Sequence, residues 1–325
     1  MAALVEQAAL GSPRAVARLV SLVEDASPLL REVMAALAPR TGRAWVVGLT
    51  GSPGVGKSTT TSAIVTAMRR NGSRVGVLAV DPSSPFSGGA LLGDRVRMQE
   101  HALDPGVYIR SMATRGHLGG LARATPQAIR VLDAAGCDVV VVETVGVGQS
   151  EVEVAAMADT TVVLLAPGMG DGVQAAKAGI LEIGDVLVVN KADRDGAATT
   201  ARELRQMVGL GAESRAPGAW QPAVVTAVAS RADGVAELLE TLAAHREWLE
   251  QGSGLREGRV RRAAAEVEAI AVATLRSRLA DVRAGAGLLE LAGRVVDGTT
   301  DPYSAADVLL GDVAGTAGAS PGPPA

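Results

Sequence analysis

Seven short, continuously apolar runs divide the middle of this chain at regular intervals. They occupy residues 45–50, 74–80, 106–111, 138–144, 160–166, 185–190 and 223–228. Helical patterns such as residues 58–70, 125–134 and 198–208 separate them. Because the runs do not alternate between apolar and polar residues, each strand must be covered on both faces, which is typical of parallel sheets with crossover helices. The sequence therefore predicts an α/β fold with a mainly parallel sheet flanked by helices.

Helical extensions flank this central region on both sides. Residues 1–42 carry apolar side chains at helical spacing, which predicts an N-terminal helical extension. The sheet domain then occupies residues 43–250. Residues 251–313 form a C-terminal helical region, and the Pro- and Gly-rich residues 314–325 are expected to be disordered.

An apolar stripe runs along the C-terminal helical region from Val260 to Val282, with charged residues opposite. A helix of this kind needs a second surface to cover its apolar side. That surface is either a partner subunit or the chain's own sheet domain. We expect the partner subunit, so residues 251–313 are predicted to dimerise the chain as a homodimer.

Composition excludes several classes of function. The 31 basic and 35 acidic residues give a net charge of −4, which argues against a nucleic-acid partner. No stretch approaches the ~18 apolar residues of a membrane span, and the N-terminus has no signal-peptide pattern, so we expect a cytoplasmic protein. The single Cys137 excludes an intrachain disulfide, and His101, His117 and His245 do not have metal-ligand spacing.

A glycine-rich segment, GSPGVGKS, lies between the first apolar run and the helix that follows it. The strand-to-helix context is the one that a phosphate-binding P-loop requires. Its glycines let backbone N–H groups turn toward a β-phosphate, Lys57 can bridge the β- and γ-phosphates, and the Ser58 hydroxyl can bind Mg²⁺. The residues predicted to bind nucleotide here are Gly51, Ser52, Pro53, Gly54, Val55, Gly56, Lys57, Ser58 and Thr59.

A second motif, Asn190-Lys191-Ala192-Asp193, directly follows the run at 185–190. The Asp193 carboxylate can accept hydrogen bonds from N1–H and from the N2 amino group of guanine, and adenine lacks this pair of donors. Lys191 can lie along the base, and Asn190 can join neighbouring loops. Because the chain has only two asparagines and three lysines, this tetrapeptide is a specific signal and favours GTP over ATP.

A third motif closes the most apolar run, where Glu143 and Thr144 are followed by Gly146. A carboxylate at a strand end suits a Mg²⁺ site, directly or through water, and the Gly146 N–H can turn toward a γ-phosphate. Asp81 and Asp94 are weaker indications when taken alone, because Asp-Pro is a common turn former.

Together these segments resemble the MeaB/ArgK family of metallochaperone-type P-loop GTPases, which are chaperones of adenosylcobalamin-dependent methylmalonyl-CoA mutase. The resemblance covers residues 10–300. It rests on GLTGSPGVGKST, LAVDPSSPFSGGALLGDRVRM, YIRSMATRGHLGGL, DVVVVETVGVGQSEVEVAAMAD and APGMGDGVQAAKAGILEIGDVLVVNKAD. It implies the P-loop NTPase fold. The chain has no Cys/His cluster of the kind that nickel and zinc insertases on related folds need for their cargo.

The resemblance also implies roles for individual residues. The predicted Mg²⁺ site contains Ser58, Asp81, Asp94, Glu143 and Thr144. The predicted catalytic residues are Lys57, Asp94, Glu143 and Lys177. Arg97 would approach the nucleotide, and Lys177 would lie in a third switch loop, residues 168–177, that faces the mutase. Gln149 follows Gly146 by three residues, so it is not assigned to position the attacking water.

The turn behind the base departs from the family pattern. Where family members carry a Ser-Ala-Leu-like element, this chain has Val228, Ala229 and Ser230. The Ala229 N–H is expected to contact guanine O6, but the side-chain support that the serine would supply is missing. Because the contact with guanine O6 is made by a backbone N–H, we still expect all three residues to contribute to nucleotide binding.

The resemblance implies a Mg²⁺-dependent GTP hydrolase that gates cofactor loading of the mutase and protects it from inactivation. Its expected partners are GTP or GDP and the mutase, with an adenosyltransferase as a further candidate, and no cobalamin is expected to bind this chain directly. Two alternatives stay open. One is an ATP-dependent kinase associated with lysine/arginine/ornithine transport, and the other is a nucleotide-regulated assembly module without meaningful turnover.

Overall fold

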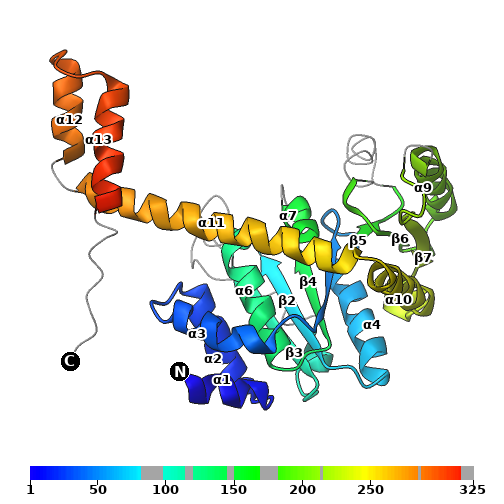
Figure 1. Ribbon diagram of the computed structural model, residues 1–325. Coiled ribbons are helices and arrows are strands. Elements are labelled where there is room, and N and C mark those ends of the chain that lie inside the picture. The colour runs from blue at the N-terminus through cyan, green and yellow to red at the C-terminus, as the bar shows by residue number, and fades with distance from the viewer. Residues whose placement is uncertain are drawn as a thin grey trace. The chain divides into compact units, whose positions relative to one another are not determined.

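A seven-stranded sheet forms the centre of the protein (Figure 1). The computed structural model describes residues 1–81, 98–113, 120–144, 150–168, 182–212, 215–284 and 287–315. The strands are β1 (Trp45–Thr50), β2 (Val75–Asp81), β3 (Val107–Ala113), β4 (Val139–Thr144), β5 (Thr160–Leu165), β6 (Val186–Asn190) and β7 (Ala223–Ala227). Their order is β3-β2-β4-β1-β5-β6-β7, and every neighbouring pair is parallel. The predicted α/β fold with a mainly parallel sheet is confirmed.

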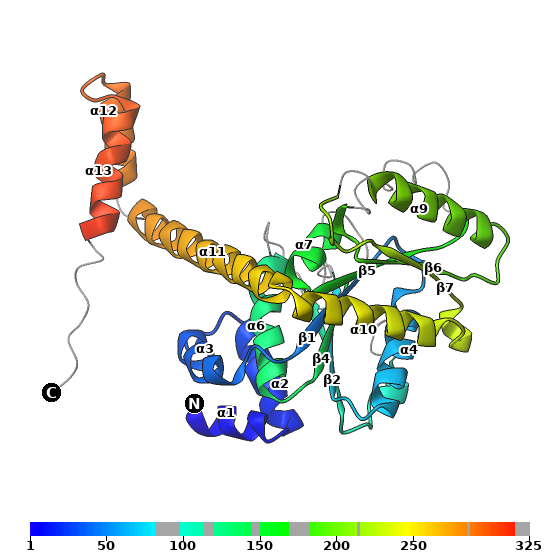
Figure 2. The same cartoon turned by 45° about the vertical axis from the view of Figure 1, so that its right-hand side comes forward.

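Helices cover both faces of the sheet, as the continuous apolar runs require (Figure 2). Helices α4 (Lys57–Arg70) and α10 (Val235–Gln251) pack on one face, and α6 (Gly120–Ala134), α7 (Ser150–Met157) and α9 (Ala197–Ala212) pack on the other. Strand β4 shows why these runs are apolar throughout: alternate residues face the two different cores. Val139 and Val141 belong to the core under α4, whereas Val140 and Val142 belong to the core under α6.

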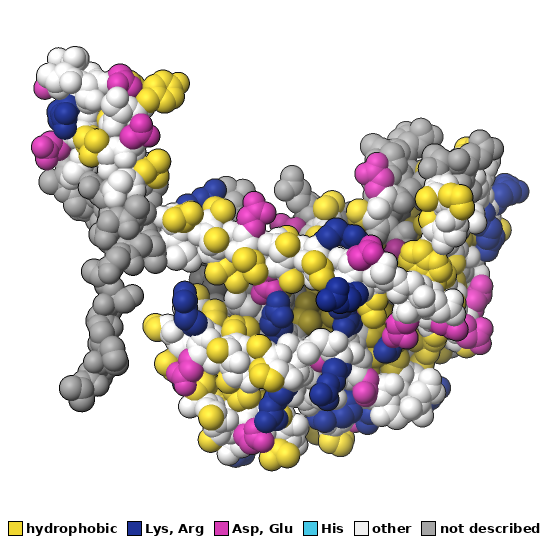
Figure 3. All heavy atoms as spheres, in the orientation of Figure 1, with side chains coloured by type: hydrophobic (Ala, Val, Ile, Leu, Met, Phe, Trp, Pro, Cys, Tyr) yellow, Lys and Arg dark blue, Asp and Glu magenta, His cyan; other side chains and the backbone are white. Residues whose placement is uncertain are grey.

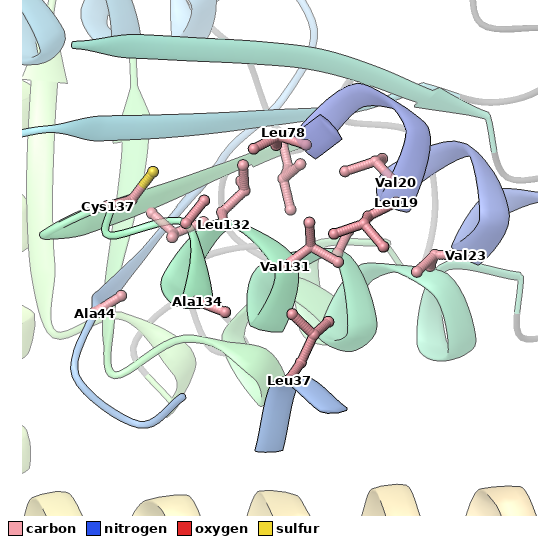
Figure 4. Close-up of a cluster of buried hydrophobic side chains, with 14 of the residues drawn as sticks. Leu19, Val20, Val23, Leu37, Ala44, Leu78, Val131, Leu132, Ala134 and Cys137 are labelled. Atoms are coloured by element: carbon pink, nitrogen blue, oxygen red, sulfur yellow. The ribbon is translucent and has the colours of Figure 1, made fainter. Parts of the chain in front are cut away.

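The N-terminal extension is part of the same core rather than a separate domain. It consists of α1 (Ala2–Ala9), α2 (Pro13–Glu24) and α3 (Leu30–Leu37), followed by the short η1 (Ala38–Arg40). Figure 4 shows Leu19 and Val20 of α2 close to Val131 of α6, with Leu37 nearby. These three helices therefore form a second layer outside α6.

Cys137 lies in this core cluster just before β4. A Cβ atom added to Gly76 of β2 would lie 2.8 Å from Leu132 Cδ1 and 3.4 Å from the Cys137 sulfur, so these two side chains fill the space that the glycine leaves. Burial raises the pKa of the Cys137 thiol to about 11. The thiol is thus protonated at neutral pH and has the role of a small core residue.

The chain divides into two compact units, Met1–Arg262 and Ala263–Ala325. Helix α11 (Gly254–Ala284) begins in the first unit and continues into the second, which also contains α12 (Gly287–Val296) and α13 (Pro302–Gly315). The division thus falls after Arg262 instead of after residue 250. The reason is that Arg259 and Arg262 both bind the buried carboxylate of Asp159 and so fix the start of α11 to the sheet unit.

The predicted disordered tail comprises residues 314–325. Residues 314 and 315 are instead the last residues of α13, and residues 316–325 lie outside the described residues. Among the helices that the structure describes, we find none with both the length and the apolarity needed to cross a lipid bilayer.

Candidate functional site

The candidate site lies at the carboxyl ends of the central strands. Strand β1 occupies the middle of the sheet, and the chain continues from it to β2 on one side, whereas β5 pairs with it on the other side. In open α/β sheets such a reversal of strand order creates a crevice where ligands bind. The glycine-rich loop that follows β1 therefore lies where the topology places a ligand.

Two glycines of this loop make close approaches that no other residue could make. Gly51 has φ +139° and Gly56 has φ +98°. A Cβ atom on Gly51 would collide with the Leu164 carbonyl of β5, and one on Gly56 would collide with the amide of Asn190. Both glycines are thus needed for the loop to fit between β5 and the Asn190 side chain.

Lys57 begins helix α4, and its ammonium group points back into the loop. Its Nζ donates hydrogen bonds to the carbonyl oxygens of Gly51, at 2.5 Å, and Ser52, at 3.0 Å. The lysine side chain is buried despite its charge. A positive charge and the N-terminus of α4 thus lie together at the loop, an arrangement that suits phosphate oxygens.

Glu143 and two hydroxyl groups of α4 form a buried cluster beside the loop. Ser58 Oγ donates to Glu143 Oε1 at 2.6 Å, and Thr61 Oγ1 donates to Glu143 Oε2 at 2.8 Å. The hydroxyls of Thr50 and Thr144, at the ends of β1 and β4, lie 3.5 Å apart. The carboxylate is held in place by two donors in a residue that is only 4 % exposed.

The chemistry of this cluster fits a hard divalent cation. Mg²⁺ prefers oxygen ligands and usually completes its shell with water and phosphate oxygens, so one hydroxyl and one carboxylate are a sufficient protein contribution. Among the described residues, no three or more His, Cys, Asp or Glu side chains lie close enough together to hold a metal ion by protein ligands alone. The cluster thus suits a cation that arrives together with a nucleotide.

Asn190 joins three loops at the same edge of the sheet. Its Nδ2 donates to the Val55 carbonyl at 2.8 Å, and its Oδ1 accepts a hydrogen bond from the Ala229 N–H at 3.1 Å. Asn190 therefore connects the glycine-rich loop with the turn η3 (Ala229–Arg231), as the sequence suggested. In this arrangement the Ala229 N–H already donates to Asn190 Oδ1. The contact between this N–H and guanine O6 that the sequence analysis expects therefore stays a prediction.

The two charged residues of the motif lie beside the same loops. Lys191 has a positive φ of 58°, and its Nζ donates to the Gly54 carbonyl at 2.6 Å. Its aliphatic chain thus spans the space between the two loops, where it could line a base. Asp193 is exposed and accepts a hydrogen bond from Arg231 Nη2 at 3.1 Å.

Several predicted residues cannot be placed in the same way. Asp81 ends β2 at the same edge of the sheet, but its side chain lies outside the described part of the structure. The others that lie outside the described residues are Asp94, Arg97, Gly146 and Lys177, and Gln149, to which no role was assigned, lies outside them as well. The described residues brought together are the glycine-rich loop, Glu143 with Thr144, and the Asn190 motif with residues 228–230.

Two residues of the site were missed in the sequence. Thr61 follows Ser58 by three positions on a helix, and this spacing places both hydroxyls on one face. That spacing was available as a signal. Arg231, which binds Asp193, had no comparable signal, because its position depends on how the turn before α10 folds.

Comparison with known proteins agrees with this geometry. The family model described as methylmalonyl-CoA mutase-associated GTPase MeaB matches residues 16–284. A protein of Pyrococcus abyssi whose name places it among GTPases is 48% identical over 313 residues, which is 96% of each chain. GTPase ArgK of Escherichia coli is 40% identical over 234 residues, which is 70% of each chain.

A mitochondrial mouse protein named methylmalonic aciduria type A homolog is 43% identical over 197 residues, which is 60% of this chain and 48% of that one. Among solved structures, LAO/AO transport system kinase superposes with a TM-score of 0.69 at 27% identity, over 96% of this chain and 97% of the other. The chain is thus similar to known proteins in sequence and in fold.

Proposed function

The chain belongs to the MeaB family of methylmalonyl-CoA mutase-associated GTPases, and we propose that it is a Mg²⁺-dependent GTP hydrolase that serves as chaperone of an adenosylcobalamin-dependent acyl-CoA mutase. The observation that carries the nucleotide part is the position of Asn190, which ties the phosphate loop to the turn at Ala229. The mutase part is supported by the family to which the chain belongs.

In this proposal the phosphate loop holds the triphosphate and the Asn190 motif holds the base. Backbone N–H groups of residues 51–59, apart from Pro53, which has none, and the Lys57 ammonium face the phosphates. Asp193 accepts the two guanine donors, Lys191 lies along the base, and residues 228–230 close the pocket behind it. Arg231 must release one carboxylate oxygen of Asp193 when guanine binds, and this exposed ion pair costs little to break.

Ser58 and Glu143 are the described residues that would hold Mg²⁺, with Thr144 beside them and with Asp81 and Asp94 as further ligands. The ion would neutralise charge on the β- and γ-phosphates. The Ser58 oxygen would offer a lone pair to the cation while its proton stays on the hydrogen bond to Glu143. Thr61 keeps the carboxylate oriented meanwhile. Lys57 stabilises charge on the transferred phosphoryl group, and Lys177 is the proposed relay from the partner.

Turnover without a partner should be slow. The Gln149 position does not match the water-positioning glutamine of small GTPases, so we place unassisted hydrolysis at roughly 10⁻⁴ to 10⁻² per second. A mutase that orders the switch loops would accelerate hydrolysis, and the change of state would gate cofactor loading. An adenosyltransferase is the proposed donor of that cofactor, and this chain does not bind cobalamin itself.

The C-terminal unit supports the proposal of a homodimer. Large apolar side chains are exposed along α11 and on the two helices that follow, including Val267 at 67 %, Leu275 at 55 % and Tyr303 at 84 %. Figure 3 shows apolar side chains following one another along α11. Exposed apolar surface of this extent marks an interaction site. A Val267→Glu/Leu275→Glu double variant should be monomeric by light scattering, whereas a dimer in that variant would place the interface elsewhere.

A kinase of lysine/arginine/ornithine transport is the second candidate, because one structurally similar protein is named LAO/AO transport system kinase. The Asn190-to-Asp193 motif favours guanine and therefore disfavours an ATP-dependent kinase. Phosphate transfer from labelled ATP to a second protein would support the kinase.

The test of the proposed function measures hydrolysis by the full chain. GTP should be hydrolysed far faster than ATP, and addition of an adenosylcobalamin-dependent acyl-CoA mutase should increase the GTPase rate. Equal rates with ATP would overturn the nucleotide assignment, and an unchanged GTPase rate with the mutase would overturn the chaperone assignment. GTP hydrolysis no faster than in buffer alone, with binding to the mutase intact, would favour the nucleotide-regulated assembly module without meaningful turnover.

A further inference from the structure

A second hollow opens at the edge of the sheet opposite to the phosphate loop. It has a volume of about 420 Å³, within the size range of small-molecule sites. Its lining includes Asp185, which precedes β6, and Trp220, which precedes β7. His245 and Trp248 of α10 form another wall. The phosphate loop follows the carboxyl end of β1, so the two sites lie at opposite ends of parallel strands.

The aromatic wall of the hollow is fixed in place. Trp220 Nε1 donates to the Asp185 carbonyl at 2.8 Å, and Trp248 Nε1 donates to the Gly218 carbonyl at 3.0 Å. The two indole centroids are 5.9 Å apart, and the His245 ring stacks at 17° to Trp248. Both tryptophans are only half-buried, although the chain has just six aromatic residues. Their ring surfaces thus border a cavity instead of filling a core.

The central imidazole of this wall is neutral. Trp45 Nε1 can only donate, and it does so to Thr160 Oγ1 at 3.0 Å, which leaves the threonine proton for His245 Nδ1 at 2.9 Å. Burial also lowers the pKa of His245 to about 4. The buried His245 therefore supports the tryptophans without adding charge, and its Nε2 lies 3.5 Å from an oxygen of Asp185.

Two arginines of the lining keep their charge available. Within the described residues Arg261 forms no hydrogen bond or ion pair, and Arg215 has a single long hydrogen bond, 3.5 Å, to the Val208 carbonyl. Arg262, by contrast, is committed to the buried Asp159. Two guanidinium groups can thus bind an anionic group at the hollow.

Asp185 supplies an acceptor on the same lining. One of its carboxylate oxygens accepts the Thr161 N–H at 2.7 Å, and the other faces His245. About a third of this side chain is exposed. A ligand with a ring-bound amino group could donate to this carboxylate.

We propose that this hollow is a second ligand site, which binds a planar heteroaromatic anion of the size of a nucleoside monophosphate. Its ring stacks on one of the two indoles, which are tilted 47° to each other, its amino group donates to Asp185, and its phosphate binds Arg215 and Arg261. Stacking of a base on an aromatic side chain and charge-assisted hydrogen bonds to phosphate are the interactions that such a ligand needs. The site goes beyond the proposed GTPase and does not depend on it.

Tryptophan fluorescence can test this site in the full chain. All three tryptophans, Trp45, Trp220 and Trp248, lie at the amino-terminal edge of the sheet, so none borders the phosphate loop. The probe is AMP, added after one equivalent of GDP with Mg²⁺ has occupied the phosphate loop. Saturable quenching is expected with AMP, weaker binding with adenosine, which lacks the phosphate, and no binding with ribose 5-phosphate, which lacks the ring.

Variants locate the binding. Arg261→Ala should weaken AMP binding by about tenfold, as expected for the loss of one charge-assisted contact. Arg256→Ala, an exposed arginine of the same helix outside the hollow, is the matched control and should bind AMP normally. Arg215→Ala is a second test if Arg261→Ala lowers the melting temperature. Lys57→Ala should leave the AMP isotherm unchanged, because it alters only the phosphate loop.

The outcomes separate this site from the proposed function. Failure of GDP to bind, with AMP quenching intact, would overturn only the GTPase. Absence of saturable quenching at millimolar AMP would overturn the second site. An AMP affinity that falls in Lys57→Ala but not in Arg261→Ala would also overturn it, because binding would then occur at the phosphate loop.

Discussion

The hydroxyl of Ser58 lies 2.6 Å from Glu143 Oε1, although the two residues are 85 positions apart in the chain. Helix α4 and strand β4 supply one partner each. The pair thus joins the helix that follows the phosphate loop to the strand next to β1. Its chemistry, one hydroxyl and one carboxylate, is the basis of the proposed cation site.

The variant Glu143→Gln tests this pair. The side chain keeps its shape and one oxygen but loses its charge, so Mg²⁺-dependent GTP hydrolysis should fall by about 100-fold or more, the range for losing one charge-stabilising group. Nucleotide affinity should fall much less. Glu240→Gln, on the exposed side of α10, is the control and should hydrolyse GTP normally. Unchanged hydrolysis in Glu143→Gln would contradict its place at the site.

Asn190→Ala should damage both stability and nucleotide binding. It leaves the buried Ala229 N–H and the Val55 carbonyl without their partner, at about 1–3 kcal/mol for each group that water cannot reach. Urea unfolding and GDP calorimetry measure the two effects. The other asparagine of the chain, Asn71, is an exposed residue after α4, and Asn71→Ala should change the free energy of unfolding by less than about 0.5 kcal/mol.

Asp193→Asn should change the choice of base. A carboxylate accepts from two guanine donors, whereas an amide offers one donor and one acceptor, which matches a base with a carbonyl in place of the N2 amino group. GDP affinity should therefore fall by about 100-fold or more, and xanthosine diphosphate should bind better than GDP. Calorimetry with both nucleotides checks this expectation. Equal loss of affinity for the two would indicate general damage to the loop.

Asp185 and His245 should give opposite pH dependences. Burial raises the pKa of Asp185 to about 6 from 3.8, so the folded state holds this proton more tightly and loses stability as the pH rises from about 4 to about 6. Burial lowers the pKa of His245 to about 4 from 6.5, so its contribution is lost as the pH falls from about 6.5 to about 4. In the native protein the two dependences largely cancel.

Two variants separate these contributions. As the pH rises from about 4 to about 6, the free energy of unfolding of the wild type should fall relative to that of Asp185→Asn. As the pH rises from about 4 to about 6.5, it should rise relative to that of His245→Gln. We expect changes of about 1 kcal/mol, because solvent reaches a third of the Asp185 side chain. Urea titrations at several pH values measure both differences. Parallel curves for the two variants would contradict the assignment.

The fold could be predicted because its signals are local. Each continuous apolar run predicts a strand that is buried on both faces, and the glycine-rich turn predicts the junction between β1 and α4. The same holds for the motif at Asn190, whose residues adjoin in sequence. Local patterns of this kind determine the sheet, and they carry the proposed nucleotide contacts.

The remaining features depend on contacts between distant segments. The first compact unit ends at Arg262 and not at residue 250, because Arg259 at the start of α11 binds Asp159 of the sheet unit. These two residues lie 100 positions apart in the chain. The second hollow combines residues from three loops and two helices, none of which forms a motif. Arg231 reaches Asp193 across 38 positions. A side chain on a turn does not reveal its partner until the turn itself is placed.

Arg259 links two strands that are not consecutive in the chain. Its guanidinium makes four hydrogen bonds, two to Asp159 before β5 and one each to the carbonyls of Gly42 and Ala44 before β1. The phosphate loop follows β1, and its Gly51 packs against the Leu164 carbonyl of β5. Any sliding of β1 against β5 must therefore carry the first turns of α11 along or break these hydrogen bonds, so Arg259 couples the positions of both strands to the base of the C-terminal helix.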